Sequence, residues 1–68
     1  MQDGDFVAKR EPTGLFRIRR FARGAFVEVP DRAGLYAEQT AKLALDTLRP
    51  DGDTWVELAN GSYELYQP

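Results

Sequence analysis

The chain has 68 residues and a net charge of −2, which allows one domain, residues 1–68, with a small core. Cysteine and histidine are absent, so disulfides and the usual zinc ligands are excluded. Residues 9–23 nevertheless carry a net charge of +5, against −5 for residues 24–68. Met1 is followed by QDGDF, which does not resemble a signal peptide, and no apolar run is long enough to span a membrane. We therefore expect a cytoplasmic protein without a membrane partner.

Three strands are predicted in the first part of the chain. Apolar residues alternate with polar ones across residues 6–10, 15–21 and 25–29, which is the pattern of strands with one buried face. Pro12 presets φ and Gly14 accepts a left-handed conformation, so we expect a turn between the first two strands.

A tight loop at Arg23 and Gly24 is predicted to join the second and third of these strands. The loop sets the register of the hairpin, and side chains then alternate between its two faces. The expected cross-strand pairs are Arg19 with Glu28 and Phe21 with Phe26.

One helix is predicted over residues 35–49. Its apolar residues recur at i, i+3 and i+4 spacing and are Ala37, Ala41, Ala44, Leu45 and Leu48. The alanines leave little side chain between helix and sheet, so the two backbones can approach closely. Tyr36 and Leu43 lie seven residues apart on the flank of this helix. We expect them either to cover the sheet edge or to form a dimer contact, which makes the chain a monomer or a weak homodimer.

A closing hairpin of residues 54–58 and 63–67 is predicted around Asn60-Gly61. Asn-Gly between two alternating runs favours a two-residue type I′ loop, with positive φ at both residues. That loop places on one face the pairs Trp55 with Tyr66 and Glu57 with Glu64. The opposite face, which should contact the helix, then carries Val56, Leu58, Tyr63 and Leu65.

These elements predict an α+β fold of the order βββ-α-ββ. It consists of a single antiparallel sheet of about five strands with one helix packed on one face. The other face, which we call the open face, is expected to carry Arg17, Arg19, Phe21, Phe26, Glu28, Trp55, Glu57, Glu64 and Tyr66. Arg20 and Arg23 are expected near the turn of the first hairpin, accessible to solvent or to a partner.

The arginines and aromatic residues of the open face have three interpretations. The arginines can be structural counter-ions, because Glu57 opposite Glu64 needs a cation nearby, from Arg17 or Arg19. Arginines and aromatic rings on an open sheet also bind single-stranded nucleic acid, although three glutamates on the same face and the net charge of −2 oppose attraction to phosphate. Alternatively the face is a protein interface, where aromatic residues and arginine are enriched and mixed charge is common.

The prediction that we favour is binding to another protein or to a ribonucleoprotein complex, with direct nucleic-acid binding as the alternative. A third possibility is a small homodimer in which the surface aromatic residues contact a second copy of the chain. The expected contact residues are Arg17, Arg19, Arg20, Phe21, Arg23, Phe26, Trp55 and Tyr66.

Catalytic motifs are not found in the sequence. There is no nucleophile motif and no glycine-rich phosphate loop, and the chain lacks histidine and cysteine. The DGD segment at residues 51–53, with Asp46 nearby, offers oxygen ligands, but its spacing fits no EF-hand and is ordinary turn chemistry. We therefore expect no enzymatic activity, no cofactor and no metal site.

Three segments cover most of the chain: the strand pair LFRIRRF and AFVEV, the alanine-rich helix AEQTAKLALDTL and the closing hairpin WVELANGSYELY. In size and element order this arrangement resembles the very small acidic proteins made by phages and mobile elements, including anti-CRISPR inhibitors. The resemblance implies a non-enzymatic inhibitor that binds a host protein or a protein–nucleic acid complex. It is a likeness of architecture, so it assigns no functional residue in this chain.

Overall fold

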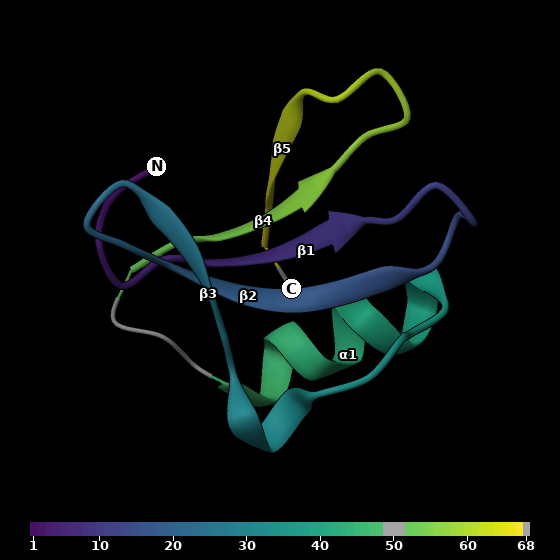
Figure 1. Ribbon diagram of the computed structural model, residues 1–68, viewed down its shortest axis with the longest axis horizontal. Coiled ribbons are helices and arrows are strands. Elements are labelled where there is room, and N and C mark those ends of the chain that lie inside the picture. Colours follow the sequence, from purple (N-terminus) through teal and green to yellow (C-terminus); the bar gives the residue numbers. More distant parts are fainter. Residues whose placement is uncertain (49–51, 68) are drawn as a thin grey trace.

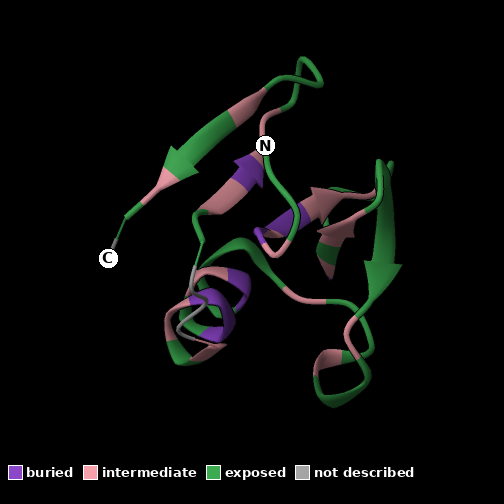
Figure 2. Ribbon diagram, turned by 90° about the vertical axis from the view of Figure 1, so that its left-hand side faces the viewer, coloured by how far each residue is buried: buried purple, intermediate pink, exposed green. Residues whose placement is uncertain are grey.

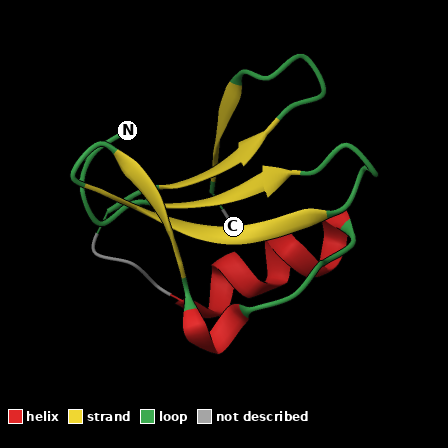
Figure 3. Cartoon of the chain, in the orientation of Figure 1, coloured by secondary structure: helices red, strands yellow, loops and turns green. Residues whose placement is uncertain are grey.

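The computed structural model describes residues 1–48 and 52–67. Within this part of the chain there are five strands, a short 3-10 helix and one α-helix (Figure 1). In chain order they are β1 (Phe6–Arg10), β2 (Phe16–Ala22), β3 (Ala25–Glu28), η1 (Pro30–Arg32), α1 (Glu38–Leu48), β4 (Thr54–Glu57) and β5 (Tyr63–Tyr66). The predicted α+β fold, one five-stranded sheet with a helix packed against it, is confirmed (Figure 3).

The sheet has the strand order β3-β2-β1-β4-β5 and is mixed, so the prediction of a purely antiparallel sheet is wrong at one pair. β4 runs parallel to β1, whereas the other three neighbouring pairs are antiparallel. β1 and β3 point the same way because both are antiparallel to β2. α1 then returns the chain to the end of the sheet where β1 and β3 begin, so the next strand runs parallel to them.

The core lies between α1 and the sheet (Figure 2). Its large, fully buried side chains come from β2 and α1 and are Phe16, Ile18 and Leu45. Ala41 and Ala44 of α1 are also buried, so the helix lies close to β1 and β2, as these alanines predict. Ala37, predicted on the same face, is exposed because it precedes the helix. One fully buried side chain, Val7, lies on the sheet face that α1 does not cover.

The α-helix begins at Glu38, three residues later than predicted, because the preceding residues pair with the sheet instead. Tyr36 forms an antiparallel bridge with Phe16, in which each backbone N–H donates to the other residue's carbonyl at 2.8 Å. The prediction that Tyr36 lies on the helix flank is therefore wrong, and its half-buried side chain packs against the core. Leu43 is on α1 and is 63% exposed, so the two residues do not share a helix face. The predicted helix end at position 49 lies outside the described residues.

The first hairpin has the predicted register. Arg23 and Gly24 have φ of 54° and 77°, and Arg19 pairs with Glu28 as Phe21 does with Phe26. Positive φ at both loop residues matches the right-handed twist of the flanking strands, so the tight loop forms although arginine tolerates this conformation less well than glycine.

The closing hairpin differs from the predicted register by one residue. The Leu58 N–H donates to the Ser62 carbonyl (2.8 Å) and the Gly61 N–H to the Leu58 carbonyl (3.0 Å), which leaves three residues in the loop. Gly61 has a φ of 86°, but Asn60 does not have positive φ, so that part of the prediction is wrong. The cause is the Asn60 side chain, whose Oδ1 accepts hydrogen bonds from the Ser62 N–H (3.0 Å) and hydroxyl (2.6 Å). This local turn favours a three-residue loop with glycine at its left-handed position.

The slip of one residue moves every β5 side chain to the opposite face. Tyr66 pairs with Thr54 and packs against the core on the helix side, so its predicted place on the open face beside Trp55 is wrong. Tyr63 and Leu65 occupy the open face in its place, opposite Glu57 and Trp55 respectively.

Replacing Gly61 by alanine is expected to lower the free energy of unfolding by about 1–2 kcal/mol, because alanine is strained at this φ. A urea melt measures the loss. Ala59→Gly in the same loop is the matched control, since position 59 does not have positive φ, and it should cost only about 0.5 kcal/mol. Equal costs at the two positions would contradict the left-handed conformation of Gly61.

Candidate functional site

The sheet face opposite α1 is strongly curled, and we call it the concave face. Phe26 of β3 and Tyr63 of β5 belong to opposite edges of the sheet, yet their ring centroids are 5.9 Å apart. In a flat sheet of five strands these edges would be about 19 Å apart. The edge strands therefore bend toward each other on the side away from the helix, which explains why Val7 is fully buried there.

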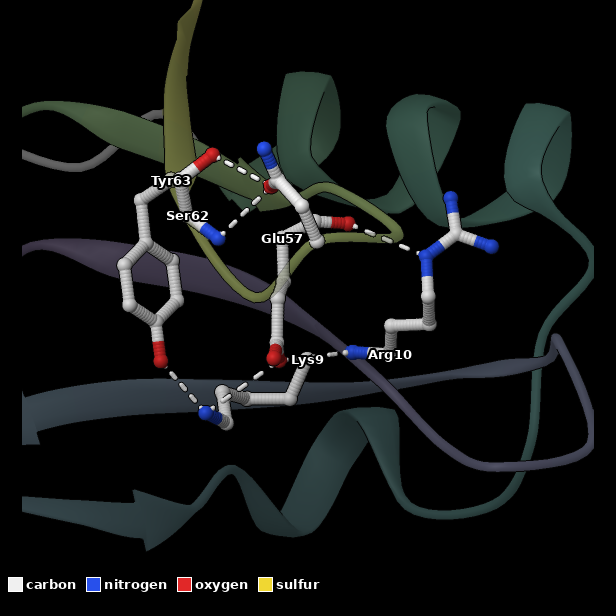
Figure 4. A network of polar contacts seen from close by, with 6 residues as sticks. Lys9, Arg10, Glu57, Ser62 and Tyr63 are labelled. Atoms are coloured by element: carbon white, nitrogen blue, oxygen red, sulfur yellow. Dashed lines mark hydrogen bonds and ion pairs between the residues drawn. The ribbon is translucent and has the colours of Figure 1, made fainter.

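Lys9 of β1 lies between the two edges of the sheet and contacts both. Figure 4 shows its contacts with Glu57 and Tyr63. Its Nζ lies 4.4 Å from the centre of the Phe26 ring and 5.0 Å from that of Tyr63. It donates a hydrogen bond to the Tyr63 hydroxyl and lies 3.2 Å from Glu57 Oε1. Burial tends to lower the pKa of Lys9, but the contacts with Tyr63 and Glu57 outweigh it and raise the pKa above 10.5. The ammonium is therefore a charged internal link between β1, β4 and β5.

Glu57 is neutralised by β1 and not by the arginines of β2. Besides the ion pair with Lys9, Glu57 Oε1 accepts a hydrogen bond from the Arg10 backbone N–H at 3.1 Å. Glu64 pairs with Val56 on the helix side, so the predicted Glu57–Glu64 pair does not form. The prediction that Arg17 or Arg19 would be its counter-ion is therefore wrong.

A buried carboxylate, that of Asp5, lies just before the start of β1. Asp5 is 3% exposed and accepts hydrogen bonds from Trp55 Nε1 (2.9 Å) and from the backbone N–H groups of Gln2 and Asp53 (3.0 Å each). Burial tends to raise the pKa of Asp5, but these hydrogen bonds lower it below its ordinary 3.8. Gly52 lies against this site, since a Cβ there would overlap Asp5 Oδ1.

Three of the predicted contact residues, Phe21, Phe26 and Trp55, do share the concave face. The Phe21 and Phe26 rings pack edge to face with centroids 5.4 Å apart. Trp55 is half-buried and tied to Asp5, so it is a structural anchor more than an exposed platform. Sequence reasoning did not assign Lys9 or Asp5, because their partners Tyr63 and Trp55 are 54 and 50 residues away.

Arg17 and Tyr66, two further predicted contact residues, have internal partners instead. Arg17 Nε lies 2.7 Å from Glu11 Oε1 in an ion pair within the β1–β2 hairpin. The Tyr66 hydroxyl donates to Asp46 Oδ2 of α1 at 3.3 Å. Burial and the hydrogen bond to Asp46 raise the pKa of Tyr66.

The remaining predicted arginines gather beside β3. Among the described residues, no ion pair or hydrogen bond engages the guanidinium groups of Arg19, Arg20 and Arg23, and both Arg20 and Arg23 are exposed. β3 is an edge strand that is exposed at every residue, with Phe26 and Val27 each 36% exposed (Figure 2). We call this surface, made of Arg19, Arg20, Arg23 and Ala25–Glu28, the basic edge.

In the part of the chain that the structure describes, no group of three or more acidic side chains is placed to hold a metal ion. Asp51 of the DGD segment lies outside the described residues. No helix among the described residues is long and apolar enough to cross a membrane.

Comparison with known proteins gives no family for this chain. No family model matches it, and no match is found among curated proteins or solved structures. The basic edge and the concave face are the features of the molecule that bear on its function.

Proposed function

We propose that this protein is a non-enzymatic binding module that attaches to another protein, free or within a ribonucleoprotein complex, through the basic edge. The observation that carries the proposal is β3, an edge strand exposed along its whole length and flanked by arginines that have no ion pair in the described chain. Exposed apolar side chains combined with arginine are typical of protein interfaces. Binding would mask a surface of the partner, as inhibitors of the phage type do.

The concave face is less suited to contact a ligand, because its aromatic residues are engaged inside the protein. Trp55 is bonded to Asp5, Tyr63 is bonded to Lys9, and Phe26 packs against Tyr63. Bases of single-stranded nucleic acid stack on rings that present a free face. The arrangement therefore favours a partner that contacts the basic edge over a nucleic acid stacked on the sheet.

Direct nucleic-acid binding is the second candidate, because Arg19, Arg20 and Arg23 have guanidinium groups that can contact phosphates. Glu28 in the same surface and the net charge of −2 weaken that attraction. A mobility shift with short single- and double-stranded oligonucleotides at low salt tests it. Nucleic-acid binding is favoured if the shift disappears in Arg20→Glu and if the binding constant falls about tenfold, for each contacting arginine, when the salt concentration rises tenfold.

Arg20→Glu and Arg23→Glu are each expected to weaken the protein complex about tenfold, mainly through a slower association that depends on salt. The partner is first captured from lysate with and without nuclease and identified, and its purified form is then measured by surface plasmon resonance. Both variants should keep the wild-type melting temperature, since these arginines are exposed.

The matched control is the double variant Gln39→Glu with Thr40→Glu. It changes the net charge by the same amount but lies on the exposed first turn of α1, where added carboxylates are favourable. The control should bind like the wild type. If it weakens the complex as much as Arg23→Glu does, the effect is one of overall charge, and the basic edge is not the binding surface.

A further inference from the structure

We infer that β3 is a strand-addition site, at which an extended acidic segment of the partner pairs its backbone with Phe26 and Glu28 and so becomes a sixth strand of the sheet. This inference rests on the proposed function and specifies the chemistry of the partner. It follows from the direction of the backbone groups of β3, from the apolar side chains on both sides of the strand, and from the charge around it.

The backbone groups of Phe26 and Glu28 point away from the sheet. In an antiparallel hairpin with a two-residue loop, every second pair exchanges backbone hydrogen bonds, and here these pairs are Ala22 with Ala25 and Arg20 with Val27. The backbone groups of the residues between them, Phe26 and Glu28, therefore point away from β2. Phe21, the partner of Phe26, confirms this alternation. Phe21 donates its N–H to the Asp5 carbonyl and accepts from the Gly4 N–H, both at 2.8 Å, on the opposite side of β2.

These outward groups are ready to pair with another strand. Within the described chain, no hydrogen bond is made by the outward N–H and carbonyl groups of Phe26 and Glu28. α1 packs on β1 and β2, which leaves β3 uncovered. β3 has no proline or lysine, its pairing with β2 has no bulge, and its one charged residue is Glu28. The next proline after the strand is Pro30.

The side chains of β3 offer apolar contact on both faces of an added strand. Phe26 lies on the concave side and Val27 on the helix side, each 36% exposed. In strand addition the backbone bonds supply affinity, while alternate side chains of the added strand supply specificity. An added strand with apolar residues at alternate positions would cover Val27, or the part of Phe26 that Phe21 and Tyr63 leave exposed.

Charge distinguishes this edge from the other edge of the sheet. Three arginines of the β2–β3 hairpin, Arg19, Arg20 and Arg23, have no ion pair among the described residues, and the fourth is paired with Glu11. The β4–β5 hairpin has no basic residue, and its two glutamates are Glu57, which is paired with Lys9, and Glu64. An acidic strand is therefore attracted to β3 and not to β5. Arg20 is on β2, so it lies two strand spacings, about 10 Å, from a strand added beside β3. An arginine side chain and a glutamate side chain together can span this distance.

The test uses the whole protein and a short acetylated and amidated peptide in which glutamate and valine alternate, with a lysine–valine peptide of the same length for comparison. Amide hydrogen exchange is followed by NMR. The amides of Phe26 and Glu28 should exchange quickly in the free protein, and the acidic peptide should slow them at least about tenfold. The amides of Tyr63 and Leu65 on the β5 edge should not change.

A pair of variants at one position separates backbone pairing from side-chain contact. Glu28→Pro removes an outward N–H and leaves the hydrogen bonds to β2 intact, as proline at a sheet edge allows. It should weaken the acidic peptide at least about tenfold. Glu28→Ala keeps the N–H and removes a negative charge, so it should bind the acidic peptide at least as tightly as the wild type. Circular dichroism establishes that both variants are folded.

Four outcomes would overturn strand addition. The first is that the acidic peptide leaves amide exchange at Phe26 and Glu28 unchanged, and the second is that the basic peptide binds as tightly as the acidic one. The third is that both Glu28 variants lose the same affinity for the acidic peptide. The fourth is that these two amides are protected from exchange without any peptide while light scattering gives a doubled mass. The last outcome would make β3 a contact with a second copy of the chain. The proposed function fails separately, if Arg20→Glu and Arg23→Glu leave the complex with the captured partner unchanged.

Discussion

Asp5→Ala is expected to lower the free energy of unfolding by about 2–4 kcal/mol. The substitution removes the acceptor of three hydrogen bonds, from Trp55 Nε1 and from the backbone N–H groups of Gln2 and Asp53. A buried donor without a partner costs about 1–3 kcal/mol. Gln2 and Asp53 are exposed residues, so their N–H groups can recover a hydrogen bond with water, whereas Trp55 is half-buried. A urea melt followed by the fluorescence of Trp55, the only tryptophan, measures the loss.

The acid side of the pH profile tests the same carboxylate. The pKa of Asp5 is lowered in the folded state, so its contribution is complete above the ordinary value of 3.8 and is lost as the pH falls through the lower folded pKa. Asp5→Asn should therefore be less stable than the wild type near neutral pH. The difference in melting temperature should narrow as the pH falls from about 4 through the lower folded pKa of Asp5, because the wild-type carboxyl becomes protonated in the folded state only below that pKa. A constant difference would contradict the charged hydrogen-bonded site.

Two further variants serve as controls for Asp5. Asp3→Ala removes an exposed carboxylate that accepts one hydrogen bond, from the Arg23 N–H, and should cost less than about 1 kcal/mol. Gly52→Ala inserts a Cβ against Asp5 Oδ1 and should also be destabilising. Its cost should shrink in the Asp5→Ala background, because the atom that it meets is then gone. Additive costs would show that Gly52 and Asp5 are independent.

Lys9→Met is expected to lower the free energy of unfolding by about 2–3 kcal/mol, although methionine keeps most of the apolar stem. The ammonium contacts Glu57, the Tyr63 hydroxyl and the Phe26 ring, and hydrogen bonds to charged groups contribute about 1.5–3 kcal/mol. Glu57 would also lose its ion-pair partner while its side chain is only 17% exposed. Chemical denaturation measures the effect, and faster exchange of the β5 amides should accompany it, because Lys9 links β5 to β1.

Lys42→Met is the matched control for Lys9. Lys42 makes an i,i+4 ion pair with Glu38 on the surface of α1, and such pairs contribute about 0.3–0.5 kcal/mol. The same chemical change there should therefore be small. Similar losses at the two lysines would mean that Lys9 is an ordinary surface cation and that the curl of the sheet does not depend on it.

The parts of the fold that could be predicted from the sequence are those fixed by contacts close in the chain. The loop at Arg23 and Gly24 sets the pairing of Phe21 with Phe26 across a two-residue connection. The apolar period of the helix likewise identifies Ala41, Ala44 and Leu45 as the buried face. In both cases the partners are within one hairpin or one helical turn, so local pattern and geometry are sufficient.

The candidate site could be predicted only in part, because the register of the β4–β5 hairpin depends on which of two loops forms. Asn60-Gly61 is compatible with a two-residue and with a three-residue loop, and the hydrogen bonds from Ser62 to Asn60 favour the three-residue loop. The choice exchanges Tyr66 for Tyr63 on the concave face. The exposed arginines Arg20 and Arg23, by contrast, follow directly from the first hairpin.

By itself, the sequence determined the five strands, the helix, the first hairpin and the concentration of arginine along it. Tertiary structure alone decided the parallel pairing of β1 with β4, the curl that brings Phe26 to Tyr63, and the use of Lys9 as their link. The physical reason is range. Alternation and turn chemistry act over a few residues, whereas sheet curvature and the partners of Lys9 and Asp5 arise only when strands from both ends of the chain pack together.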